Sequence, residues 1–199
     1  DGRVTLTLPK GVSEKAGLDF ARDKADWLRH NTSRHGDVQI VGEGTRLSVE
    51  GQALTVTRGS GRAVRIEAGQ ILVPGEADRL PARLAGYLKT LARDRLAAAS
   101  DRYAARLGRG YSRLTLRDTR SRWGSCSAEG ALSYSWRLIM APVEVLDYVA
   151  AHEVAHLAEM NHSDRFWARV EEIHGPYAAQ RAWLRREGAA LHRVRFDLD

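Results

Sequence analysis

Cysteine is nearly absent from this sequence of 199 residues, and its one cysteine, Cys126, excludes a disulfide bond within the chain. A lone cysteine fits a reducing compartment, so we expect a cytoplasmic protein. Long hydrophobic runs are also missing: no uncharged apolar stretch approaches the roughly 20 residues that a membrane-spanning helix needs. We therefore expect no membrane as partner, and nothing in the sequence specifies an oligomeric state.

The charges show no block of five or more of one sign, although the chain is basic overall. A net charge of +6 arises from 31 Lys and Arg residues against 25 Asp and Glu residues. This balance admits nucleic acid as a partner, but a solvated, arginine-rich surface is the simpler explanation. With 43% apolar and 28% charged residues, the composition is that of an ordinary globular protein.

The first part of the chain begins with an alternating pattern. Val4, Leu6 and Leu8 alternate with threonines, which predicts a short strand that Pro9 ends. Ser13 is expected to cap a helix that runs to about His30 and carries Phe20, Trp27 and Leu28.

Glycine-separated strands follow this helix. The pattern predicts strands over residues 38–41, 52–57, 63–67 and 70–73, and Pro74-Gly75 closes the segment. We therefore expect a β-rich N-terminal region over residues 1–76 and a second domain over residues 77–199.

The second region reads as mostly helical. A long helix is predicted over residues 77–107, and the glycines at 108 and 110 end it. Strands are predicted over 113–117 and 131–138, then helices beginning at Pro142 and at Ser163, and a last helix with Trp183 and Leu184. The fold class is thus α+β. Residues 131–138 are our candidate for an edge strand that binds an extended peptide, although an ordinary internal strand gives the same pattern.

The helix from Pro142 carries the sequence His152-Glu153-Val154-Ala155-His156. Residues four apart on a helix share one face and lie about 6 Å apart along the axis, so two imidazoles can close on one cation. Glu153 follows His152 by one residue and is therefore rotated by about 100° around the helix. From there its carboxylate can reach a water molecule on the metal without being a metal ligand itself. This HExxH pattern is that of zinc peptidases, with two metal ligands and a general base. A helix with two surface histidines and a salt-bridged glutamate is the plain alternative.

A third imidazole, His162, follows in Asn161-His162-Ser163. Asn161 is suited to end the helix in a left-handed conformation, and Ser163 is suited to cap the next helix. His162 is therefore the expected third ligand, which leaves a fourth position for water. The competing carboxylate ligands are Glu159, which is poorly placed on the same helix, and Glu171 and Glu172, which are harder to dismiss.

Six segments form a wider pattern around this motif: 120–127 (Arg-Ser-Arg-Trp-Gly-Ser-Cys-Ser), 138–142, 147–149, 152–157, 161–163 and Phe166-Trp167, with a weaker one at 8–13 and 24–28. Together they resemble the YgjP-like family of metal-dependent hydrolases, which is similar to the SprT-type zinc peptidases. The resemblance implies a compact zincin-type domain, with Zn²⁺ held by His152, His156 and His162 and with Glu153 as catalytic base.

The expected function is a zinc-dependent metallopeptidase that acts on peptides or proteins. Two alternatives stay open: a nucleic-acid-associated protease of the SprT type, and a metal-stabilised binding module with little turnover. A thiol nucleophile at Cys126 is a weaker interpretation, because the histidines with clear spacing already form the metal pattern. His174 and His192 have no partner at such a spacing and are expected at the surface or at helix ends.

Overall fold

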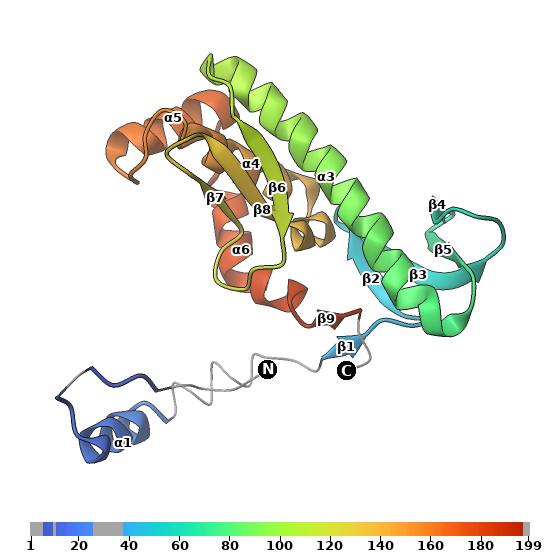
Figure 1. Ribbon diagram of the computed structural model, residues 1–199, viewed down its shortest axis with the longest axis horizontal. Helices are drawn as coiled ribbons and strands as arrows, with labels where there is room; N and C mark the ends of the chain where they lie inside the picture. Colours follow the sequence, from blue (N-terminus) through green and yellow to red (C-terminus); the bar gives the residue numbers. More distant parts are fainter. Residues whose placement is uncertain (1–5, 10, 26–37, 197–199) are drawn as a thin grey trace. The chain divides into compact units, whose positions relative to one another are not determined.

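The computed structural model describes residues 6–9, 11–25 and 38–196 (Figure 1). The chain divides into two compact units, residues 1–38 and residues 39–199. Within the described residues, no helix combines the length and the apolar character needed to cross a bilayer.

The first unit contains helix α1, Glu14–Asp23. Ser13 caps it as predicted, because its hydroxyl accepts a hydrogen bond from the backbone N–H of Ala16 at 3.3 Å. Trp27 and Leu28, the predicted later part of this helix, lie outside the described residues. The predicted strand at Leu6 and Leu8 is wrong for residues 6–9, which form no ladder. Leu8 instead packs on the helix, with its Cδ2 only 2.5 Å from the place of a Cβ at Gly17.

The second unit combines short sheets with helices, and this confirms the α+β class. Its strands are β1 (Gln39–Ile40), β2 (Arg46–Val49), β3 (Gln52–Gly59), β4 (Arg65–Glu67), β5 (Gln70–Pro74), β6 (Arg113–Arg117), β7 (Gly124–Cys126), β8 (Ala131–Ser135) and β9 (Val194–Arg195). Its helices are α3 (Leu80–Leu107), α4 (Val143–Ala155), α5 (Asp164–His174) and α6 (Ala178–Leu191), with 3₁₀ turns at Ala77–Arg79 and Trp136–Met140. The sequence pattern predicted most of these elements and missed the short strands β2, β7 and β9.

Four strands form the β-rich part in the order β2-β3-β5-β4, with β3 and β5 parallel. The buried face of this sheet carries apolar side chains that alternate with exposed ones, as in Leu47 and Val49 of β2. A 3₁₀ turn then leads directly into α3, so the boundary predicted near Glu76 falls inside the second unit. Separate folding on either side of that boundary stays a prediction.

The other sheet has the order β6-β8-β7, in which β8 pairs in parallel with β6 and antiparallel with β7. The prediction of residues 131–138 as a substrate-binding edge strand is therefore wrong. Both sides of β8 are occupied by neighbouring strands, and the chain turns into a 3₁₀ helix at Trp136. The edge strand is β7, whose three residues are too few to give a periodic signal.

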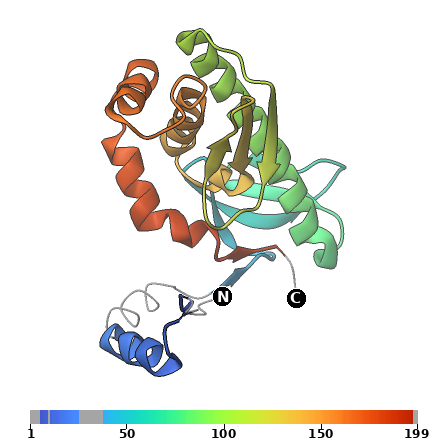
Figure 2. The same ribbon diagram turned by 60° about the vertical axis from the view of Figure 1, so that its left-hand side comes forward.

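The long helix α3 runs beside this sheet and α4 lies behind it, as Figures 1 and 2 show. Gly108 ends α3 with a left-handed backbone (φ 70°), which glycine adopts without strain. Between sheet and helices, the hydroxyl groups of Tyr134 and Ser100 are 3.0 Å apart. The core fixes the position of α4, because this helix packs against β7, α3, α5 and α6.

Candidate metal centre

Three imidazoles converge at the end of α4. His152 is in the last turn of that helix, His156 is its C-terminal cap residue, and His162 follows in the connection to α5. The Nε2 atoms of His152 and His162 are 3.1 Å apart, and one ligand nitrogen from each of the three residues lies within 4.8 Å of the others. The structure thus brings together all three histidines that the spacing singled out.

The connection itself differs from the prediction. The helix ends at Ala155 rather than at Asn161, and Asn161 has no left-handed backbone: among the described non-glycine residues, only Glu50 and Ala68 have positive φ. Asn161 acts through its side chain, whose Oδ1 accepts a hydrogen bond from the backbone N–H of Ser163 at 3.2 Å. This Asx turn leads into α5 and holds the segment that carries His162.

The donor set fits a zinc ion. Two nitrogen ligands of one tetrahedral zinc, with bonds of about 2.0–2.1 Å, are separated by about 3.4 Å, close to the 3.1 Å between His152 and His162. Burial lowers the pKa of His152 to about 3, with smaller contributions from His156, His162 and Arg181. Burial also lowers the pKa of His156. Both imidazoles are therefore neutral near pH 7, which leaves a lone pair on each for a metal.

An aromatic platform holds the three rings. Phe166 of α5 is fully buried, and its ring centroid lies 4.8 Å from that of His152, 4.4 Å from that of His156 and 4.8 Å from that of His162. Nδ1 of His156 is 3.0 Å from the backbone carbonyl of Glu159, a contact that directs Nε2 of His156 toward the other histidines. In the sequence, Phe166 stood out only as one of the residues that carry the resemblance to the YgjP-like family, and its place beneath the imidazoles was not predicted.

Glu153 lies beside this cluster as a buried carboxyl group with 5% of its surface exposed. Burial raises the pKa of Glu153 to about 8, and the positive charge of Arg122 opposes that shift. A cation held by the three histidines would act in the same direction as Arg122 and lower the pKa of Glu153 from this raised value, because an opposite charge favours the carboxylate. Burial thus brings the pKa of this carboxyl group near neutrality, the range in which a side chain can both accept and donate a proton.

Gly124 of β7 touches the Glu153 side chain directly. A Cβ at this position would lie 2.5 Å from both Cγ and Oε1 of Glu153. A glycine is therefore required here for steric reasons, so that β7 can pass over the buried carboxyl group. No sequence pattern predicts the contact between Gly124 and Glu153, because it spans 29 positions of the chain.

A cleft of 450 Å³ opens over the three histidines and Glu153. Its walls come from residues 122–126 around β7, from Tyr148 of α4, from Met160 in the loop after α4, and from Leu184 of α6. Cys126 also lines it, but burial, followed by the charge of Glu153, raises the pKa of its thiol to about 11. A thiol so seldom ionised is a poor nucleophile, which disfavours the cysteine mechanism.

The competing ligand candidates lie elsewhere. Among the described residues, no carboxylate joins the three imidazoles in the cluster. Glu172 pairs with Arg169 at 2.6 Å on α5, and Glu171 is exposed on the same helix. His174 lies between the rings of Tyr103 and Tyr148, and His192 stacks on Trp123 with ring centroids 4.8 Å apart. These two histidines are therefore packing residues at helix ends, as expected.

Comparisons with known proteins place this geometry in a family. The model of the YgjP-like metallopeptidase domain matches residues 1–187 of the chain. No curated protein matches the sequence. Among solved structures, the chain is similar to the metallopeptidase zymogen of Pyrococcus abyssi abylysin, at 21% identity and a TM-score of 0.41. That similarity covers 47% of this chain and 92% of the other.

Proposed function

The chain belongs to the YgjP-like family of metallopeptidases, and on that premise we propose that it hydrolyses peptide bonds with a zinc ion held by His152, His156 and His162. The observation that carries this proposal is the juxtaposition of three converging imidazoles with one buried carboxyl group at the floor of an open cleft. Three protein ligands leave one position of a tetrahedral zinc free, which is typical of catalytic rather than structural zinc sites.

Glu153 is the proposed catalytic base. Zinc in such a site polarises the scissile carbonyl group and lowers the pKa of water to about 7. Glu153 accepts a proton as water attacks the carbonyl carbon, and it then donates that proton to the leaving amine as the C–N bond breaks. The burial of Glu153 supports both proton transfers, because it raises the pKa of the carboxyl group. A higher pKa makes the carboxylate a stronger base toward water and keeps the proton available for donation to the leaving amine near neutral pH.

The free edge of β7 is the proposed binding surface for the substrate backbone. In the antiparallel pair with β8, the backbone of Ser125 points toward β8, so the N–H and C=O groups of Gly124 and Cys126 point to the opposite edge. The bonds from Ser135 N–H to the carbonyl of Trp123 and from Ser127 N–H to that of Ala131 fit this alternation, and among the described residues no strand pairs with the other edge of β7. An extended peptide placed there gains main-chain hydrogen bonds next to Glu153.

The experiment that tests this function combines metal analysis with a peptide-library digest. We expect one zinc per chain in the purified protein, and cleavage products that disappear when a chelator removes the metal. His162→Ala should lose most of the bound zinc, whereas His174→Ala, which changes an imidazole outside the cluster, should keep it.

Two results would count against the proposal. If His162→Ala retained full zinc affinity while Glu171→Gln or Glu172→Gln lost it, the third ligand would be wrong. If zinc bound as expected but no peptide of a broad library were cleaved, a metal-stabilised binding module would be the better description.

A further inference from the structure

A second groove, of 830 Å³, lies on the outer face of the β6-β8-β7 sheet, directly across β7 from the metal cleft. The two hollows share Arg122, Gly124, Ser125 and Cys126 as lining residues. Strand β7 is thus a narrow wall between them, and a peptide bound along its free edge borders both.

Strand register decides which side chains face each hollow. Thr115, Ser133 and Ser125 are register partners across the three strands and share one face of the sheet. Gly124, the neighbour of Ser125, faces the other side, because a Cβ there would meet Glu153. The side chains of a peptide paired with β7 therefore alternate, one toward the metal cleft and the next toward the outer groove.

The outer groove has a basic and hydroxyl-rich lining. Its floor is made of small side chains on β7 and β8, and the arginines at its sides are Arg113 and Arg117 of β6 and Arg122 before β7. All three arginines are exposed, and none of them forms an ion pair within the described ranges. The groove therefore presents to a ligand three arginines that have no ion-pair partner among the described residues.

Nearby carboxylates do not neutralise this lining. Asp118, at the end of β6, is engaged by Arg137, with an Nε to Oδ1 distance of 2.6 Å. Glu129 is fully exposed; hydrogen bonds with Ser127 and with its own backbone keep its pKa low, and the charge of Arg113 contributes less. No carboxylate lines the groove itself.

We propose that this groove makes the enzyme selective for acidic substrates: glutamate or aspartate side chains, at every second position of a strand bound beside β7, point into the groove next to Ser125, toward Arg122 and toward Arg113 and Arg117 on the far side of β8. The inference rests on the proposed function and adds a substrate class to it. Nucleic acid is the weaker match, because the one aromatic residue that lines the groove, Tyr134, is buried and offers no surface for base stacking.

The test has a cleavage arm and a binding arm. In the cleavage arm, the full-length protein digests a peptide library, and acidic residues should be enriched at alternate positions counted from the scissile bond. In the binding arm, catalytically impaired Glu153→Gln is titrated with two peptides that differ only in having Glu or Gln at alternate positions. The acidic peptide should bind about tenfold more tightly, since each exposed ion pair contributes a few-fold, and salt should reduce the difference.

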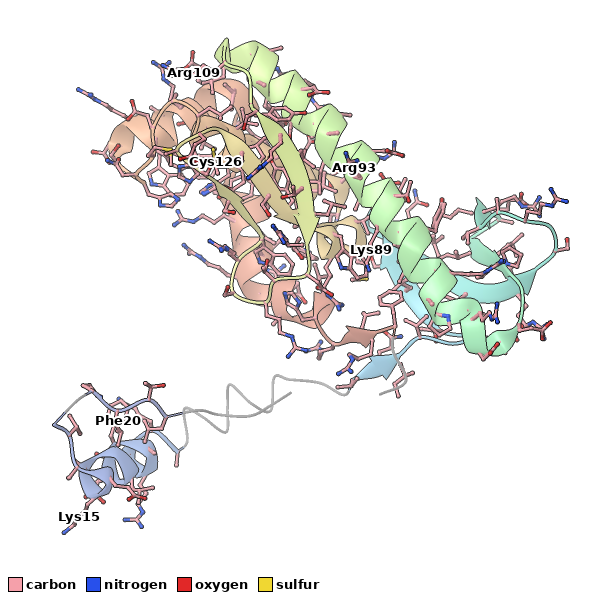
Figure 3. The ribbon with its side chains drawn as sticks, viewed as in Figure 1. Lys15, Phe20, Lys89, Arg93, Arg109 and Cys126 are labelled. Carbon is pink, nitrogen blue, oxygen red and sulfur yellow. The ribbon has the colours of Figure 1, made fainter. Side chains whose placement is uncertain are left out.

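The decisive comparison uses charge-matched variants. Arg113→Gln/Arg117→Gln should remove most of the preference in both arms, because it takes away two of the three positive charges of the groove and so weakens binding and cleavage of the acidic peptide. Arg62→Gln/Arg93→Gln removes two exposed charges outside the groove, and Arg93 lies on α3, away from Cys126 of β7 (Figure 3). This control should keep the preference.

Each contrary outcome has its own meaning. Equal loss of the preference in both double variants would attribute it to net charge and overturn the inference. Cleavage that depends on Glu153 but ignores acidic residues would also overturn it, and would leave the peptidase intact. If no peptide is cleaved, the proposed function fails, and the binding arm still decides about the groove. An oligonucleotide that binds only when Arg113 and Arg117 are present, with no discrimination between the peptides, would refute the acidic-peptide assignment.

Discussion

Gly124→Ala is a one-methyl change that should disable Glu153 without touching the metal ligands. The added Cβ would lie 2.5 Å from Cγ and Oε1 of Glu153 and 2.7 Å from its Cδ, whereas ordinary contacts begin at 3.4 Å. The carboxyl group must therefore move by about 1 Å. Glu153 lines the open cleft, so its carboxyl group can move into that space, but such a move takes it away from its present position beside the three histidines.

The size of the effect follows from this displacement. Misplacing a reacting group by about 1 Å can cost about 10² in rate, so kcat should fall about a hundredfold while zinc content stays at the wild-type level. The overpacking should also lower the free energy of unfolding by about 1–3 kcal/mol. Steady-state kinetics on a cleavable peptide, metal analysis and urea unfolding measure the three quantities.

Two comparisons make the result specific. Gly86→Ala adds the same methyl group where nothing lies within 4 Å, so it should leave turnover unchanged and stabilise α3 by up to about 1 kcal/mol. Glu153→Asp shortens the side chain and makes room for the methyl group, so Gly124→Ala should cost less in that background than in the wild type. Full activity of Gly124→Ala would refute the steric argument, and so would additive losses in the double variant.

Three further predictions concern stability. The pKa of Glu153 rises on folding from 4.5 to about 8, so the stability that its neutral carboxyl group contributes is complete below pH 4.5 and is lost as the pH rises to 8. Urea unfolding of chelated protein between pH 6.5 and 8.5 should therefore show a loss of stability in the wild type that Glu153→Gln lacks, and parallel curves for the two proteins would contradict this prediction. Zinc bound to the native state alone stabilises it by about 2.7 kcal/mol at a hundredfold excess over Kd, so a chelator should lower Tm. An unchanged Tm in verified metal-free protein would show that zinc does not bind the native state in preference to the unfolded chain. Arg137→Ala should cost about 3 kcal/mol in urea unfolding, because this buried guanidinium binds Asp118 and the carbonyls of Leu191 and Val194; a loss below about 0.5 kcal/mol would show that these bonds contribute little.

The parts of the site that the sequence predicted are those within one helix and its next turn. His152 and His156 are four residues apart, so helix geometry alone brings them to one face, and Asn161 with Ser163 indicated a turn that returns His162. The sequence also predicted the long helix α3, because its 28 residues carry apolar side chains at helical spacing and are followed by Gly108.

The missing parts depend on contacts between distant segments. Strand β7 has only three residues, which is too short for a recognisable alternation of apolar and polar side chains. It is a strand because it pairs with β8, and the sequence therefore did not predict it. The same holds for Gly124 against Glu153 and for Phe166 beneath the three imidazoles, because neither contact has a fixed spacing in the chain. The alternation in residues 131–138 was read correctly as a strand over 131–135, but alternation does not tell a central strand from an edge strand.

The central claim is that Glu153 acts on the substrate and does not hold the metal. Zinc content and peptide turnover, measured side by side for wild type and Glu153→Gln, test it most directly, because glutamine keeps the size of the side chain but cannot accept a proton. We expect wild-type zinc stoichiometry together with a loss of at least about a hundredfold in kcat/KM. Equal zinc-dependent cleavage by both proteins, or loss of zinc from the variant, would contradict the mechanism.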